Sequence, residues 1–380
     1  MKHSFLLLIA GFICYVSIVQ AQSDVYDSIN VGGRWRTFMT HIPKGYNPSK
    51  RYPLVLAFHG GSPLGYQSIQ FQSRLTQKSD ADGFVLVYPE GTRIAGARTY
   101  NAGACCAPAT TANINDVEFV DVLLNTVFAT RSIDTSRVYA TGFSNGALLC
   151  YRLANELPQR FAAIAPVAGC LVIYPWSPKK AVPIISFHSY QDQNVKYYGG
   201  ITTGTTGTYF PPQDSMLGVI ATGYSCSRLK DTLLHQQSKY DHFIYRDCSC
   251  GVVIEQYVSY DGEHSWPGGQ STGNVDVSDQ FNATELMWEF FKKYTTACGT
   301  TSSVDESSFL EHRVYPNPFT STIMLAPASL NSSHVRLINN LGIEVWSGTN
   351  LQGQDFSMLP HGLYVLRIND QQAVMVIKGR

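Results

Sequence analysis

A serine stands between two glycines in the segment Gly142-Phe-Ser144-Asn-Gly146, after an apolar run and before residues with helical apolar spacing. The pattern G-x-S-x-G between a strand and a helix is typical of a nucleophile elbow, a strained turn that exposes the serine hydroxyl. The flanking glycines keep side chains out of this tight crossing. We therefore predict Ser144 as the nucleophile of an acyl transfer; the alternative is a glycine-rich turn with an N-capping serine.

A serine hydroxyl is barely ionised at neutral pH, so it requires a histidine base whose tautomer is fixed by a carboxylate. His264 lies in a Gly- and Pro-rich loop directly after the predicted strand Val252–Ser259 and is the expected base. His235 and His242 are the rival bases, but both lie in a polar hairpin away from any clear strand end.

Asp192 is the expected carboxylate, because it follows the predicted strand Pro183–Phe187 at the carboxyl end, where open sheets build their sites. The order Ser, Asp, His along the chain also fits a hydrolase triad. Three other carboxylates remain as alternatives: Asp214, Asp241 and Asp261. The last lies too close to His264 in sequence to reach its ring in the usual geometry.

Acyl transfer also requires donors for the developing oxyanion. The backbone N–H of Asn145, directly after the nucleophile, is one expected donor. Gly61 is the other, in the segment Phe58-His59-Gly60-Gly61-Ser62, where the glycines let the backbone approach a substrate closely. We expect His59 to brace this loop and not to act as a base.

Short apolar runs alternate with amphipathic stretches, which predicts an α/β fold with a mainly parallel sheet covered by helices on both faces. The predicted strands are Arg34–Ile42, Pro53–Phe58, Phe84–Tyr88, Arg137–Thr141, Ala162–Val167, Pro183–Phe187 and Val252–Ser259, and the predicted helices are Asp116–Ala129, Asn145–Leu157 and Asp279–Tyr294. The β-rich tail adds strands at Val335–Ile338, Gly362–Ile368 and Ala373–Ile377.

Four segments are expected: a signal peptide over residues 1–21, the α/β domain over 22–298, a Ser/Thr-rich linker over 299–312 and a small all-β module over 313–380. An uncleaved anchor helix is the alternative for the first segment, but its apolar run is short for a membrane span and small residues follow it. No other apolar run is long enough to cross a membrane, so we expect an exported mature chain without a membrane span.

The 28 basic and 28 acidic residues balance, which argues against nucleic acid as a partner. No phosphate-binding loop, dinucleotide fingerprint or metal-ligand cluster occurs, so neither a cofactor nor a metal is expected. Eight cysteines remain after residue 21, and in an exported chain they are expected to form disulfides. Their connectivity stays open, except that Cys226 is expected to reach Cys248 or Cys250 across a hairpin.

The motifs taken together resemble the polyhydroxybutyrate depolymerase-like branch of the α/β-hydrolases, which includes the feruloyl and acetylxylan esterases of carbohydrate esterase family one. The segments that carry the resemblance are Phe58-His-Gly-Gly61, Tyr88-Pro-Glu-Gly91, Asn101-Ala-Gly-Ala-Cys-Cys106, Asp116–Asp121, Val138–Gly146, Phe161–Gly169, His264-Ser-Trp-Pro-Gly268 and Trp288–Phe291. The family triad falls on Ser144, Asp192 and His264. The chain departs from the family at His188-Ser-Tyr-Gln-Asp192, where Ser-Tyr replaces Gly-Thr.

The tail resembles a type A sorting domain of the type nine secretion system, through Tyr315-Pro-Asn-Pro-Phe319 and Gly362-Leu-Tyr-Val-Leu366. This implies a chain that is secreted or held at the cell surface, with the secretion machinery as a partner; the alternative is a small carbohydrate-binding module.

The resemblance implies a secreted serine esterase that cleaves feruloyl or acetyl groups from plant cell-wall polysaccharide. Tyr100, Tyr190 and Trp266 are candidates to stack on sugar or ferulate rings. A polyester depolymerase is the alternative enzyme, and a non-catalytic carbohydrate-binding protein is the alternative of another class.

Overall fold

The computed structural model describes residues 23–173, 175–202, 208–234, 239–297, 313–315, 319–326, 333–339, 344–369 and 372–378. The predicted signal peptide and linker lie outside these residues, as does Cys298. The described residues form one large α/β unit and one small β unit, each with its own apolar core.

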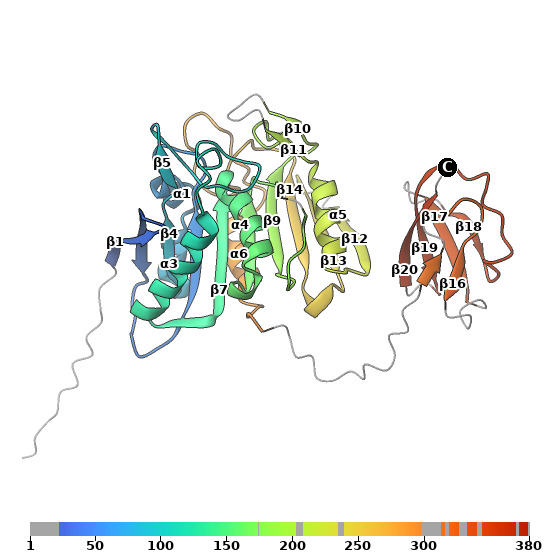
Figure 1. Ribbon diagram of the computed structural model, residues 1–380, viewed down its shortest axis with the longest axis horizontal. Coiled ribbons are helices and arrows are strands. Elements are labelled where there is room, and N and C mark those ends of the chain that lie inside the picture. Colours follow the sequence, from blue (N-terminus) through green and yellow to red (C-terminus); the bar gives the residue numbers. More distant parts are fainter. Residues whose placement is uncertain are drawn as a thin grey trace, which may run out of the picture.

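A ten-stranded sheet in the order β1-β2-β4-β3-β7-β8-β9-β14-β13-β12 forms the centre of the large unit (Figure 1). The six strands from β4 to β14 in this order are parallel, and antiparallel strands flank them on both sides. The bounds are β1 Ser23–Val31, β2 Arg34–Ile42, β3 Tyr52–Phe58, β4 Val85–Pro89, β7 Ile133–Phe143, β8 Ala163–Val167, β9 Ile184–Ser189, β12 Arg228–Leu234, β13 Tyr240–Arg246 and β14 Ile254–Ser259. The predicted α/β class is confirmed.

Helices cover both faces of this sheet because the central strands are apolar on both faces (Figure 1). In β3, Leu54, Leu56 and Phe58 join the core formed with α3, α4 and α5, while Val55 and Ala57 join the core formed with α1, α2 and α6. The bounds are α1 Tyr66–Ser73, α2 Leu75–Asp82, α3 Asp116–Thr130, α4 Asn145–Glu156, α5 Gln213–Gly223 and α6 Ala283–Phe291.

The predicted elements are present, but three helices and several strands were not predicted. The helices α1 and α2 consist mostly of polar residues, and α5 contains two glycines, so none of them shows a clear apolar stripe. The last helix begins later than predicted, because the Asn282 side chain accepts a hydrogen bond from the Glu285 N–H and caps it there.

In the described part of the chain, three two-stranded sheets and one four-stranded sheet accompany the large sheet. The two-stranded sheets pair β5 Thr92–Ile94 with β6 Ala97–Thr99, β10 Gly200–Ile201 with β11 Tyr209–Phe210, and β15 Arg313–Tyr315 with β16 Met324–Ala326. The four-stranded sheet has the order β18-β17-β19-β20, with bounds Glu344–Gly348, Val335–Asn339, Gly362–Ile368 and Gln372–Lys378. The predicted β-rich character of the tail is confirmed.

The cysteines pair only in part as predicted. Cys226 bonds to Cys248 across the hairpin of β12 and β13, which confirms one of the two expected partners. A second disulfide joins the neighbours Cys105 and Cys106, and Cys250 is also disulfide-bonded. Cys150 and Cys170, however, are free thiols buried in the core, so the expectation that every mature cysteine forms a disulfide is wrong.

Candidate active site

Ser144 lies in the turn between β7 and α4, in a strained backbone conformation with φ 53° and ψ −119°. A Cβ atom at Gly142 would lie 2.5 Å from the Gly146 carbonyl, and one at Gly146 would lie 2.1 Å from the Phe58 carbonyl oxygen. Glycine is therefore the residue that fits at both positions. The Ser144 side chain does not cap α4, and the residue is half-buried, so the turn presents a hydroxyl to solvent.

The His264 imidazole and the Asp192 carboxylate meet after β14 and β9, which are neighbouring parallel strands. His264 Nδ1 donates to Asp192 Oδ2 at 2.8 Å. The other oxygen, Oδ1, accepts from the N–H groups of Asn194 and Val195, each at 2.8 Å. This arrangement fixes the proton on Nδ1 and leaves Nε2 with the lone pair that a general base requires.

Asp192 is almost fully buried, which would raise the pKa of an isolated carboxyl. The positive charge that the His264 ring carries when protonated, together with its hydrogen bond, opposes this effect. With smaller effects of His188 and the Val195 N–H, it holds the pKa of Asp192 below its usual range. The carboxyl therefore stays ionised at neutral pH.

The His264 ring packs against the ring of Phe143, the residue before the nucleophile, with centroids 4.8 Å apart. This contact places the imidazole beside the elbow. Among the hydrogen bonds of the described residues, none joins Ser144 Oγ to His264 Nε2. Such bonds are often long in enzymes without substrate and shorten when the substrate binds.

The loop after β3 lies against the nucleophile, because a Cβ atom at Gly60 would be 3.2 Å from Ser144 Cβ. Within the described residues, the backbone N–H groups of Gly61 and Asn145 have no hydrogen-bond partner. Two free donors flanking the serine are what an oxyanion site requires.

His59 fixes the position of this loop through two hydrogen bonds. Its Nε2 accepts from the Gly91 N–H at 2.9 Å, so its Nδ1 carries the proton and donates to the Gly60 carbonyl at 2.6 Å. Burial lowers the pKa of His59 to about 4, which keeps the ring neutral. The contacts fit a bracing role for His59.

Two of the three predicted substrate-facing aromatics do not face solvent, and this part of the prediction is wrong. Tyr100 is fully buried, and its hydroxyl donates to the Pro89 carbonyl at 2.8 Å. Trp266 is also fully buried, and its Nε1–H donates to Thr284 Oγ1 at 2.9 Å. Both aromatic residues support the active-site loops from within the core.

Tyr190, the third candidate, is half-buried on the loop that carries Asp192. Its ring is nearly parallel to those of Tyr198 and Tyr260, with interplanar angles of 24° and 16°. The hydroxyls of Tyr190 and Tyr260 both donate to the Asp241 carboxylate, each at 2.7 Å. The side chain is thus held in an aromatic cluster and keeps part of its surface exposed.

The rival residues have other partners. Asp241 holds the two tyrosines, Asp214 accepts from the Tyr197 hydroxyl, and Asp261 accepts from Ser278 and Gln280. His242 pairs with Glu255 through its Nε2 at 2.9 Å, and His235 lies outside the described residues.

His188 is a contributor to which the sequence analysis gave no role. Its Nε2–H donates to the Val195 carbonyl at 2.7 Å, and Nε2 lies 3.8 Å from Asp192 Oδ2. His188 therefore stabilises the loop that carries Asp192. Burial lowers the pKa of His188, which favours the neutral ring. The available signal was its position four residues before the acid, at the end of a strand.

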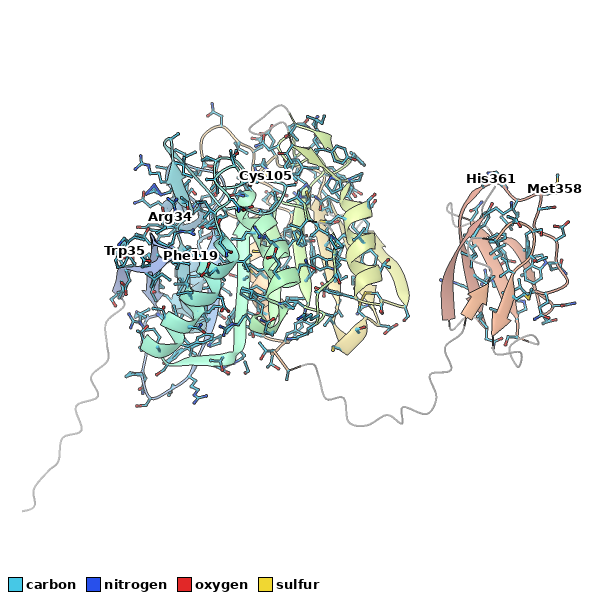
Figure 2. The ribbon with its side chains drawn as sticks, in the orientation of Figure 1. Arg34, Trp35, Cys105, Phe119, Met358 and His361 are labelled. Atoms are coloured by element: carbon cyan, nitrogen blue, oxygen red, sulfur yellow. A yellow bond between two sulfur atoms is a disulfide. The ribbon has the colours of Figure 1, made fainter. Side chains whose placement is uncertain are left out.

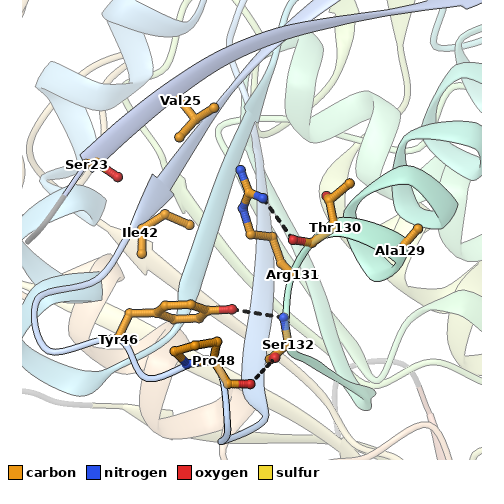
Figure 3. A pocket seen from close by; sticks show the side chains of 9 residues that line it. All are labelled: Ser23, Val25, Ile42, Tyr46, Pro48, Ala129, Thr130, Arg131 and Ser132. Atoms are coloured by element: carbon orange, nitrogen blue, oxygen red, sulfur yellow. Dashed lines mark hydrogen bonds between the residues drawn. The ribbon is translucent and has the colours of Figure 1, made fainter. Parts of the chain in front are cut away.

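A pocket of about 380 Å³ opens beside β1 and β2, near the residues that precede β7 (Figure 3). Its lining includes Tyr46, Thr130, Arg131 and Ser132. Arg131 and Ser132 directly precede β7, whereas Ser144 directly follows that strand. The Tyr46 hydroxyl accepts from the Ser132 N–H at 2.9 Å. The pocket contains none of the triad candidates and is not the site of the chemistry.

Within the part of the chain that the structure describes, no group of three or more His, Cys, Asp or Glu side chains is arranged to hold a metal ion. None of the helices in that part has the length and apolar character to cross a membrane.

Comparison with known proteins gives two family matches. Residues 37–195 match the esterase PHB depolymerase family, and residues 313–378 match the secretion system C-terminal sorting domain. The latter match supports a secreted or cell-surface location.

Among similar proteins, the chain is 24% identical over 268 residues to the bifunctional acetylxylan esterase/xylanase XynS20E of Neocallimastix patriciarum, which covers 69% of this chain but 34% of that protein. It is 26% identical over 264 residues to feruloyl esterase C of Emericella nidulans, which covers 67% of this chain and 83% of that one. A solved acetyl xylan esterase from Aspergillus awamori is 14% identical, with a TM-score of 0.48, and the match covers 70% of this chain and 99% of that chain.

Proposed function

We propose that the chain, whose residues 37–195 match the esterase PHB depolymerase family, is a secreted serine esterase acting on feruloyl or acetyl side groups of plant cell-wall polysaccharide. The observation that carries the proposal is the 2.8 Å hydrogen bond from His264 to the buried Asp192, beside a serine in a strained elbow. The names of the similar proteins support the substrate class.

In the proposed reaction, Ser144 Oγ attacks the ester carbonyl and passes its proton to His264 Nε2. The Asp192 carboxylate stabilises the imidazolium that forms. The N–H groups of Gly61 and Asn145 stabilise the oxyanion of the tetrahedral intermediate. When this intermediate collapses, the ester C–O bond breaks and His264 returns the proton to the leaving alkoxide.

Deacylation uses the same groups. A water molecule loses a proton to His264 Nε2 and attacks the acyl-enzyme carbonyl, and the serine leaves with that proton. No cofactor or metal takes part in these steps. Tyr190 is proposed to contact the acyl or sugar part of the substrate, because it is the one aromatic candidate that remains partly exposed.

The domain boundaries remain proposals: a signal peptide over residues 1–21, the esterase domain over 22–298, a linker over 299–312 and the sorting domain over 313–380. In this proposal the tail is recognised by the secretion machinery during export and is then removed. Mass spectrometry of the exported protein tests both ends of the chain.

Hydrolysis of p-nitrophenyl acetate tests the reaction, with Ser144→Ala as the inactive variant. Activity that survives in Ser144→Ala would refute the proposed nucleophile, and an inactive wild-type protein that binds xylan would favour the non-catalytic alternative. Release assays on methyl ferulate, acetylated xylan and polyhydroxybutyrate then rank the substrates. Preferred hydrolysis of polyhydroxybutyrate would favour the polyester alternative.

A further inference from the structure

A second pocket, of about 200 Å³, lies between β2 and the hairpin of β5 and β6. Four arginines line it: Arg34 and Arg36 from β2, and Arg93 and Arg98 from the hairpin. Trp35 also lines it and is 69% exposed. Figure 2 shows Arg34 and Trp35 next to each other on the strand.

Only two of the four guanidinium groups have acidic partners in the described structure. Arg36 pairs with the buried Asp116 at 2.6 Å, and Arg98 pairs with Glu90. Arg34 and Arg93 have no hydrogen-bond or ion-pair partner among the described residues. The pocket therefore carries an excess of two positive charges.

The hairpin places two of these cations directly opposite each other, because Arg93 pairs in register with Arg98. Like charges in such cross-strand pairs are destabilising. Two buried polar atoms of the same pocket, Thr92 Oγ1 and Arg98 Nη1, also have no hydrogen-bond partner within the described residues. Unpaired buried polar atoms are costly, and the two features together indicate a site built for a bound anion.

The pocket and Ser144 lie at the same end of the parallel strands, because both Glu90 and Ser144 follow the carboxyl ends of such strands. Glu90 and Gly91 follow the carboxyl end of β4, and the Gly91 N–H donates to Nε2 of His59. His59 in turn holds Gly60, whose position lies against Ser144. Residues of the pocket and the loop beside the serine are thus joined through His59.

We propose that this pocket, named here the arginine pocket and defined by Arg34, Trp35, Arg36, Thr92, Arg93 and Arg98, binds the carboxylate of a uronic acid unit on the polysaccharide substrate. The proposal rests on the proposed function and narrows its substrate to an acidic polysaccharide. Guanidinium groups match the planar geometry of a carboxylate and can hold it through paired hydrogen bonds. The small volume suits a single substituent.

The test measures binding by full-length protein carrying Ser144→Ala, so that no ester is turned over. Isothermal titration compares xylotetraose bearing glucuronic acid with unsubstituted xylotetraose and with free glucuronate, at low and at high salt. We expect the substituted oligosaccharide to bind about tenfold more tightly than either comparison ligand at low salt, and the difference to shrink at high salt.

Adding Arg93→Gln is expected to remove the preference for the substituted oligosaccharide. Arg131→Gln lies at the separate pocket before β7 and is expected to leave this preference intact. Arg93→Gln should also raise the melting temperature, because it removes the charge facing Arg98.

Equal binding of the substituted and unsubstituted oligosaccharides, or an unchanged preference in Arg93→Gln, would overturn the proposal. Free glucuronate binding as tightly as the oligosaccharide would overturn the polysaccharide assignment and leave a general anion site. Because the binding assay uses an inactive protein, its outcome is separate from that of the hydrolysis assay.

Discussion

Replacing Asp192 with asparagine tests the orientation of the base. In the structure, Oδ1 accepts from two backbone N–H groups and Oδ2 accepts from His264 Nδ1. An asparagine keeps its carbonyl oxygen toward the two backbone N–H donors, since the reverse orientation would point its NH₂ group at the N–H groups of Asn194 and Val195. Its NH₂ group then points at His264 Nδ1 and holds the proton of the ring on Nε2.

A ring with its proton on Nε2 cannot take the proton of Ser144. We therefore expect Asp192→Asn to lower kcat by about 10⁴-fold, which corresponds to about 5 kcal/mol of transition-state stabilisation. The fold should persist, because the two backbone hydrogen bonds are kept. Asp134→Asn, a half-exposed carboxylate at the start of β7 that pairs with Arg137, is the control and should retain activity.

The assay is the hydrolysis of p-nitrophenyl acetate at neutral pH, with the melting temperature measured alongside. A loss of less than about tenfold in a folded Asp192→Asn protein would refute the reasoning, because the base would then be working without its carboxylate.

Three further predictions follow from the glycines, a buried histidine and a disulfide. Gly146→Ala should destabilise the protein by at least about 3 kcal/mol in urea titrations, because its Cβ would lie 2.1 Å from a carbonyl oxygen. The control Gly218→Ala, in open space on α5, should stabilise the protein by about 1 kcal/mol, and equal effects of the two variants would contradict the steric argument. The pKa of His59 is lowered from 6.5 to about 4, so the unfolded protein binds a proton that the folded protein does not bind between these pH values. The free energy of unfolding should therefore fall by about 3 kcal/mol as the pH drops from 6.5 to 4. A His59→Gln variant should show a smaller fall, and a fall as large as that of the wild-type protein would exclude this cause. Replacing both Cys226 and Cys248 by serine should cost about 3 kcal/mol in the same titrations, since the bond closes a loop with a sequence separation of 22; an unchanged midpoint would refute it.

The sequence predicted most of the sheet, because its central strands are short apolar runs separated by clear turns. It did not predict α1 and α2, because these helices consist mostly of polar residues and have no apolar stripe at helical spacing. The triad candidates could be placed from chain order and strand ends alone, and the structure brings Asp192 and His264 together. Their roles, and that of Ser144, stay predictions until activity is measured.

Burial was the property that the sequence analysis could not supply. Tyr100 and Trp266 flank the site in sequence, yet tertiary packing turns both rings into the core, while Tyr190 keeps part of its surface. The arginine pocket was also out of reach, because it depends on the register that places Arg93 opposite Arg98 and on the packing of that hairpin beside β2.

The central claim is that the Ser144 hydroxyl carries the acyl group, and covalent labelling tests it most directly. After incubation with a fluorophosphonate probe, mass spectrometry of the digested protein should find one label per chain, on the peptide that contains Ser144, and none in Ser144→Ala. A label on another residue, or an active enzyme that takes no label, would contradict the account.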